Sequence, residues 1–112
     1  MTGVTIDDFV KLDIRCGTVI DAQPFPEARR SAIKLVVDFG DTLGTRKSSA
    51  QITDLYTPAD LIGRKVMAVV NLPPRQIGPF MSEVLVLGFP DAEGRIVLAS
   101  PGDSVPDGAR MS

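Results

Sequence analysis

The sequence predicts an all-β domain, a small barrel of five strands with short helices attached. Three observations lead to this prediction. Apolar and polar residues alternate with a period of two in several stretches bounded by Gly and Pro, the pattern of half-buried strands. One short helical pattern follows the third of these stretches, and more strand patterns come after it. That order of elements is the order of the OB-fold, a five-stranded Greek-key barrel with a helix between strands three and four.

A short helix is predicted at the N-terminus. Ile6, Phe9 and Val10 occupy positions i, i+3 and i+4, which is the spacing of an amphipathic turn, and Thr5 precedes them as a candidate N-cap. From residue 12 to residue 22 the period changes to two, which predicts the first strand. Gly17 suits a bulge or a sharp bend in this strand, as a small barrel needs in order to close.

The next elements are two strands and the mid-chain helix. Residues 23–30 contain two prolines and are predicted as a connection, and residues 33–39 alternate most clearly of all. A turn is expected at residues 40–44, followed by a third strand at residues 45–53 with a polar centre. Thr57 as cap, Pro58 at the first helical position and Gly63 as terminator predict a short helix.

The second half of the chain adds a central strand and extra C-terminal strands. Residues 65–72 are almost continuously apolar, so this strand is expected to be covered on both faces. Residues 71–81 contain three prolines and a glycine and are predicted as a long shaped loop. Strands at residues 83–89 and 95–99, joined by a hairpin turn, precede a turn-rich tail. Without an internal repeat or a linker pattern, residues 1–112 are expected to form one domain.

Composition limits the chemistry that the chain can carry. Hydrophobic residues make up 44% and charged residues 23% of the 112 residues, values typical of a globular domain. There is one cysteine, Cys16, and no histidine, which excludes intrachain disulfides, Cys/His zinc sites and His-dependent nucleophiles. No phosphate-binding glycine loop or esterase elbow is present. We therefore expect a binding protein without catalysis, cofactor or resident metal, with Cys16 as a buried structural thiol.

No apolar run approaches the length of a spanning helix, and the first residues lack the pattern of a signal peptide. The expectation is a cytoplasmic protein that does not insert into a membrane. The net charge is −2, but residues 29–75 hold eight Lys and Arg against four Asp, a net of +4, so the remainder carries −6. This basic middle is either an electrostatic footprint for an anionic partner or a set of solvated strand edges and turns.

Residues 71–82 are the strongest candidate for a binding surface. Prolines stiffen the segment, Arg75 offers a fork of hydrogen-bond donors, and Phe80 is a candidate for an exposed apolar contact. The alternative is that Phe80 closes one end of the barrel. Exposed aromatic residues that could stack on nucleic-acid bases are few, since the chain has five Phe, one Tyr and no Trp.

Four segments resemble the stand-alone tRNA-binding domain family, which includes the C-terminal domain of bacterial methionyl-tRNA synthetase: residues 8–17, 35–40, 56–63 and 71–75. The resemblance covers nearly the whole chain. At residues 50–52, at Gln76 and at residues 84–85 the sequence departs from the tRNA-binding members. Residues 48–53 and 82–88 instead resemble the CsaA branch of the family, which is described as dimeric chaperones that assist protein export.

This resemblance implies an OB-fold homodimer that binds unfolded preproteins or peptides, contacts the Sec export machinery, and has neither catalysis nor a cofactor. The alternative is a tRNA-binding module that recognises tRNA mainly through its backbone and shape. The residues predicted to bind peptide are Lys47, Ser49, Asn71, Arg75, Phe80 and Ser82. The residues predicted to bind nucleic acid, in the alternative, are Arg29, Arg30, Lys34, Lys47 and Arg75.

The apolar residues of the N-terminal helix and of residues 84–89 and 96–99 exceed what one small barrel easily buries. A two-fold dimer that covers these segments is therefore expected.

Overall fold

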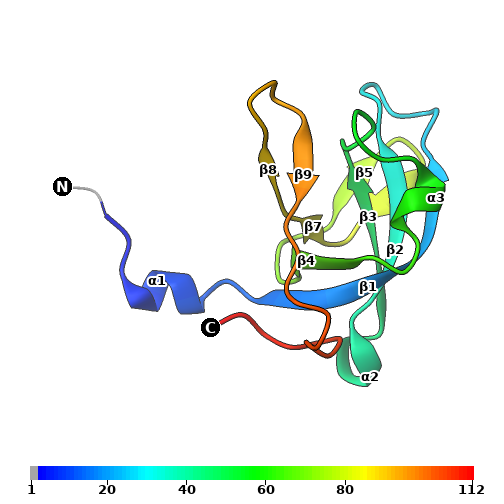
Figure 1. Cartoon of the computed structure of the whole chain (residues 1–112). Helices are drawn as coiled ribbons and strands as arrows, with labels where there is room; N and C mark the ends of the chain where they lie inside the picture. The colour runs from blue at the N-terminus through cyan, green and yellow to red at the C-terminus, as the bar shows by residue number, and fades with distance from the viewer. Residues whose placement is uncertain (1–2) are drawn as a thin grey trace.

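The computed structural model describes residues 3–112, and its strands form a nearly closed antiparallel barrel (Figure 1). The five-stranded sheet has the order β3-β2-β1-β4-β7, and two further pairs, β5-β6 and β8-β9, are attached to it. The helices are α1 (Ile6–Val10), α2 (Gly40–Leu43) and α3 (Pro58–Leu61). The strands are β1 (Ile14–Pro24), β2 (Ile33–Asp38), β3 (Thr45–Ala50), β4 (Lys65–Val69), β5 (Arg75–Ile77), β6 (Phe80–Ser82), β7 (Leu85–Val86), β8 (Gly88–Pro90) and β9 (Ile96–Leu98).

The predicted all-β barrel is confirmed, with α3 between β3 and β4 and extra strands at the C-terminal end. Strand alternation places one row of β2 in the core, where Leu35 and Val37 are fully buried, and the opposite row on the outside. The α1 helix also forms where it was predicted. The Thr5 hydroxyl accepts a hydrogen bond from the Asp8 backbone at 3.3 Å, and the Asp8 carboxylate accepts one from the Thr5 backbone.

The barrel closes where β3 meets the segment between β6 and β7. The Lys47 carbonyl accepts hydrogen bonds from the backbone N–H groups of Glu83 and Val84, at 2.8 and 3.3 Å. Ser48, which is 1% exposed, donates its hydroxyl hydrogen to the Val84 carbonyl at 2.9 Å. The buried Ser48 hydroxyl is thus satisfied by a backbone carbonyl, which explains a polar residue at the centre of β3.

Of the two roles predicted for Gly17, a bulge or a sharp bend, the bulge lies elsewhere, at Ile20. The pairing of β1 with β2 shifts between Val19 and Asp21, which turns the Ile20 side chain outward and leaves it 48% exposed. Gly17 has a different role, since a Cβ at this position would lie 2.6 Å from Val37 Cγ1 and 2.8 Å from the Phe39 ring. The glycine therefore permits close packing of β1 on the core.

Three further boundaries differ from the sequence prediction. Residues 71–81 are not only a loop, because Arg75–Ile77 and Phe80–Ser82 pair as a β-hairpin, with Gly78 at a φ of +54° in its turn. The strand expected at residues 83–89 is divided into β7 and β8. The turn expected at residues 40–44 contains one turn of helix, α2, whose N-terminal Gly40 has a φ of +87°.

The C-terminal segment forms a strap along β1. Backbone hydrogen bonds join Cys16 to Gly108 and Ala109, and Met111 to Ile14. The strap is fastened at Asp107, whose carboxylate accepts hydrogen bonds from Thr18 and from Lys65, at 2.7 and 2.8 Å. Cys16 lies beneath it and is 5% exposed, so the predicted buried thiol is confirmed, and burial raises its pKa.

Candidate functional site

The cations of the chain divide into two groups by their partners. Five of the twelve Lys and Arg side chains form ion pairs with carboxylates: Lys11, Arg15, Lys65, Arg95 and Arg110. Among residues 3–112, the other seven have no carboxylate oxygen within 4.0 Å: Arg29, Arg30, Lys34, Arg46, Lys47, Arg64 and Arg75. All seven belong to the basic middle of the sequence.

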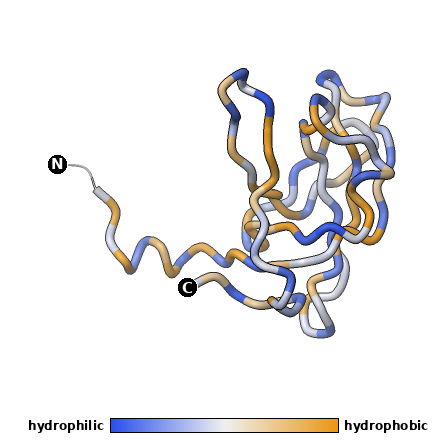
Figure 2. The backbone as a smooth tube through the Cα atoms, in the orientation of Figure 1, coloured by the Kyte–Doolittle hydropathy of each residue, from blue (hydrophilic) through white to orange (hydrophobic). Residues whose placement is uncertain are grey.

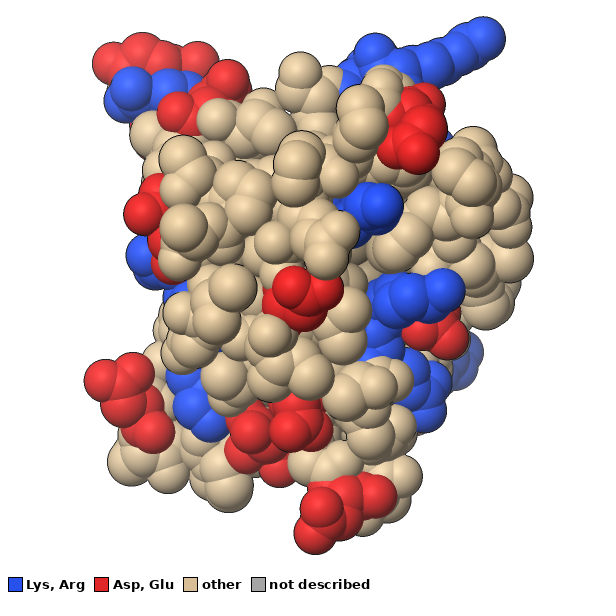
Figure 3. Space-filling view, turned by 90° about the vertical axis from the view of Figure 1, so that its right-hand side faces the viewer, with Lys and Arg blue, Asp and Glu red and all other residues tan. Residues whose placement is uncertain are grey.

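Unpaired cations leave this part of the molecule with positive charge that no neighbouring acid neutralises at contact distance. Figure 3 views the molecule from the right-hand side of Figure 1 and shows most of the visible Lys and Arg atoms on one half of that face, with Asp and Glu scattered over all of it. The lack of a carboxylate within 4.0 Å of these seven cations, among residues 3–112, favours the electrostatic interpretation of the basic middle over that of ordinary solvated turns.

Three of these cations lie over aromatic rings: Arg64 over Tyr56, at 5.1 Å from the ring centroid, and Lys34 and Lys47 over two rings that come from distant segments. Phe25 and Phe80 pack edge to face, with ring centroids 5.4 Å apart and an interplanar angle of 63°. The Lys34 ammonium lies 5.5 Å from the Phe25 centroid and 5.9 Å from that of Phe80, and the Lys47 ammonium lies 5.3 Å from the Phe80 centroid. We call Phe25, Lys34, Lys47 and Phe80 the cation–aromatic cluster.

The strand register explains why these lysines share one face. Lys34 pairs with Ser49 and Val36 pairs with Lys47 across β2 and β3, and cross-strand partners point to the same side of a sheet. Their neighbours along each strand are buried, so this row faces outward. The outer face of β2 and β3 thus presents ammonium groups, a hydroxyl and an apolar side chain within a small area.

The β5-β6 hairpin is fastened over the edge of this face. The Ser82 hydroxyl accepts a hydrogen bond from the Ser49 backbone at 3.1 Å, and the Glu83 carboxylate accepts one from the Lys47 backbone at 2.9 Å. The Glu83 carboxylate is thereby occupied by a backbone N–H. These two bonds hold Phe80, at the start of β6, against Phe25 and the lysines.

The structure brings together most of the predicted peptide-binding residues. Lys47, Ser49, Phe80 and Ser82 lie at the junction of β3 and β6. Arg75 is exposed and pairs with Ser82 across the hairpin. Asn71 is engaged elsewhere, because its side-chain amide accepts from the Asp13 backbone and donates to the Lys11 carbonyl, which ties it to the N-terminal segment.

The structure places two of the five residues predicted for nucleic-acid contact in the same cluster. Lys34 and Lys47 are part of it, and Arg29 and Arg30 are exposed on the connection that follows Phe25. Phe25 was not predicted to be a site residue, because the prolines on either side of it favoured an interpretation of residues 23–30 as a connection without a binding role. An aromatic residue held between two prolines is a signal that could have identified it as an anchored ring.

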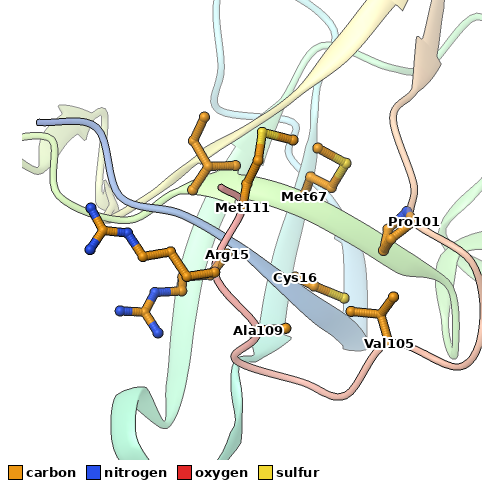
Figure 4. Close-up of a pocket in the computed structure, with 9 residues that line it drawn as sticks. Arg15, Cys16, Met67, Pro101, Val105, Ala109 and Met111 are labelled. Carbon is orange, nitrogen blue, oxygen red and sulfur yellow. The ribbon is translucent and has the colours of Figure 1, made fainter. Parts of the chain in front are cut away.

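A second kind of surface is apolar and lies at the N-terminal side. A small pocket of about 210 Å³ is lined by β1, β4 and the C-terminal strap, with Cys16 and Val105 facing each other and Met67 beside them (Figure 4). A wider groove of about 430 Å³ continues under α1 and shares Arg110 and Met111 with the pocket. Arg110 and Arg15 both contact the Asp13 carboxylate, and the Arg15 hydrogen bond holds the pKa of Asp13 below its usual value.

Within residues 3–112, no cluster of three or more His, Cys, Asp or Glu side chains is arranged to hold a metal ion. None of the helices described here has the length and apolar character needed to cross a bilayer. The arrangement can offer apolar contact, hydrogen bonds and positive charge to a ligand.

Comparison with known proteins identifies the family. A family model described as "Putative tRNA binding domain" matches residues 14–110. The chain belongs to this family. The predicted resemblance to CsaA-type members is confirmed by two solved structures. The chaperone CsaA of Bacillus anthracis is 50% identical, with a TM-score of 0.90, and the match covers 99% of this chain and 100% of that one.

The CsaA chaperone protein of Picrophilus torridus is 44% identical over 98% of this chain and 100% of its own, with a TM-score of 0.92. Among curated proteins, the methionine–tRNA ligase of Porphyromonas gingivalis is 34% identical over 96% of this tRNA-binding domain. The chain spans only about 15% of that ligase. The family is a non-catalytic binding module, and the ligase names refer to proteins that carry it as one part.

Proposed function

We propose that this tRNA-binding-domain protein is a non-catalytic export chaperone that binds unfolded preproteins or peptides as a homodimer. The observation that carries the proposal is the likeness to two CsaA chaperones at 50% and 44% identity over the full length of both partners. The likeness to methionine–tRNA ligases is weaker, at 34%, and concerns a small part of each ligase. A cytoplasmic location and contact with the Sec export machinery belong to the same proposal.

The cation–aromatic cluster and the β5-β6 hairpin support a site for polypeptide. A chaperone must bind many sequences, so it needs apolar contact for side chains and hydrogen-bonding groups that accept any backbone. Phe80 supplies the first, and Lys47 and Arg75 supply donors beside it. The hairpin is short and tied to β3, which limits the entropy that ligand binding would cost.

The α1 helix supports the homodimer. It has five residues, none of them buried, and projects away from the barrel (Figure 1). Its apolar residue Ile6 is separated from Phe9 and Val10 by Asp7 and Asp8 (Figure 2), and Ile6 is 72% and Val10 54% exposed. A helix this short is not stable alone in water, so its apolar side needs a partner surface.

The β8-β9 hairpin offers a second uncovered apolar face. Phe89, which is 70% exposed, pairs across the hairpin with Val97, which is 42% exposed, so both side chains point the same way. A second copy of the chain is the partner we propose for these surfaces, because the groove lined by Ile6, Phe9 and Val10 of α1 is present on every copy and two copies can cover it reciprocally about a two-fold axis.

The second candidate function is tRNA binding. The seven unpaired cations favour it, since phosphate neutralisation by Lys and Arg is the main source of affinity for a nucleic-acid backbone. The small number of exposed aromatic rings favours contact with the backbone over stacking on bases.

A side-by-side titration tests the two functions. Reduced, carboxymethylated α-lactalbumin serves as a permanently unfolded chain and bulk tRNA as the nucleic acid, each at about 50 and about 200 mM salt. We expect micromolar or tighter binding of the unfolded chain at both salt concentrations, and tRNA binding that weakens steeply at the higher one. An absence of measurable binding of the unfolded chain at either concentration would overturn the chaperone proposal.

A further inference from the structure

The charged and the apolar contact groups of the candidate site occupy one place. The ammonium groups of Lys34 and Lys47 lie 5.9 and 5.3 Å from the centroid of the same ring, that of Phe80. They are therefore at most about 11 Å apart, and both border the same ring. A ligand that covers the Phe80 ring comes close to both ammonium groups.

Either proposed ligand is larger than this area. An extended polypeptide advances about 3.3–3.6 Å per residue, so three or four residues already span the cluster. A nucleic-acid strand places one phosphate on each nucleotide, so two or three nucleotides span it as well. The β5-β6 hairpin borders the cluster on one side through the Ser82–Ser49 hydrogen bond.

The two ligands also make opposite demands on the lysines. In the free protein the ammonium groups rest over aromatic rings, because no carboxylate among the described residues lies within 4.0 Å of them. A phosphate forms a charge-assisted hydrogen bond with a lysine, which is stronger than a cation–π contact at a partly exposed ring. Polyanion binding thus draws Lys34 and Lys47 away from Phe80 and places the phosphates where the side chains of a client polypeptide would lie.

We infer that a nucleic-acid backbone and an unfolded polypeptide compete for the cation–aromatic cluster, so that RNA displaces client chains from this protein. The inference rests on the proposed chaperone function. It makes RNA a competitive regulator of client binding: client affinity falls as the concentration of free RNA rises, and falls less at high salt, where RNA binds more weakly. Occupancy by one polymer excludes the other without any change in the fold.

The test measures binding of fluorescein-labelled, reduced carboxymethylated α-lactalbumin to the intact protein by anisotropy, at several fixed concentrations of bulk tRNA. We expect the apparent Kd for the unfolded chain to rise in proportion to tRNA concentration, at least tenfold and without a plateau, and no complex that contains both ligands in native mass spectrometry. Polyglutamate and heparin replace tRNA in parallel, to separate nucleic-acid phosphates from anionic polymers in general.

Direct titrations with each ligand alone separate the possible failures. If the unfolded chain does not bind by itself, the proposed function fails. If it binds and tRNA does not bind, or if tRNA binds but the apparent Kd reaches a plateau or stays constant, the competition is refuted while the chaperone function stands. Competition by polyglutamate as strong as that by tRNA would overturn RNA as the specific regulator.

Variants locate the competition on the structure. In the double variant Lys34→Gln/Lys47→Gln we expect tRNA binding at low salt to weaken at least tenfold, and tRNA to lose its ability to displace the unfolded chain by the same factor. Arg95→Gln is the matched control, because Arg95 is an exposed cation that is paired with Asp91 on the turn of the β8-β9 hairpin. Displacement that is as strong in the double variant as in Arg95→Gln would place the competing site elsewhere.

Discussion

Replacing Phe80 by alanine tests whether the ring is a contact for client chains or a part of the core. A fully buried Phe→Ala change costs about 3–5 kcal/mol of stability, and Phe80 is only half-buried, so we expect a loss of about 2 kcal/mol. The edge-to-face contact with Phe25 accounts for about 0.5–1.5 kcal/mol of this and each lysine contact for about 0.5–1 kcal/mol. In a chain of 112 residues this corresponds to a fall in Tm of about 6–12 °C.

The same substitution is expected to weaken binding of unfolded chains by roughly 1–2 kcal/mol, about five- to thirtyfold in Kd, as for a contact residue at an interface. Calorimetry gives the change in Tm, and anisotropy with a labelled unfolded chain gives the change in Kd at a temperature where the variant is folded. Met81→Ala is the matched control, because Met81 follows Phe80 in β6 and therefore points to the opposite face. Unchanged client affinity together with a lowered Tm would show that Phe80 is a core residue only.

The remaining predictions concern charge, assembly, packing and acid stability. Arg75→Glu should keep the fold, because Arg75 is exposed, and should weaken binding most for acidic peptides in a peptide array. Light scattering at micromolar concentration should give a dimer mass, and Ile6→Asp on the exposed side of α1 should shift it to the monomer; a monomer in the unchanged protein would refute the dimer. Gly17→Ala should lower stability by about 1–3 kcal/mol in urea unfolding, since its Cβ would clash with buried side chains, and a neutral result would mean that β1 can shift. Burial alone would raise the pKa of Asp107, but hydrogen bonds from Lys65 and Thr18 outweigh it and keep the folded pKa below the usual value. The stability that Asp107 contributes is complete above the unfolded pKa of about 4 and is lost as the pH falls through the folded pKa. Between about pH 5 and about pH 2.5, the Tm of Asp107→Asn should therefore fall less than the Tm of the unchanged protein. An equal fall in the two Tm values would contradict this.

The sequence by itself determined the elements whose signals are local. Alternation at period two predicts β2 correctly, with Leu35 and Val37 inside, because side chains of a strand point to opposite faces regardless of what surrounds them. The Thr5 cap of α1 is likewise recognisable, since a capping hydroxyl acts on a backbone N–H three residues away. The order of these local elements was enough to indicate the barrel.

Tertiary structure decided the features that depend on contacts between distant segments. Barrel closure places the bulge at Ile20 and turns that side chain outward, which no pattern within β1 indicates. The hairpin at residues 75–82 is held by hydrogen bonds from the β3 backbone to the side chains of Ser82 and Glu83. This position of the hairpin brings Phe80 into contact with Phe25. Which cations are paired and which are free also follows from packing, because an ion pair needs its two groups within about 4 Å and the sequence gives only their number.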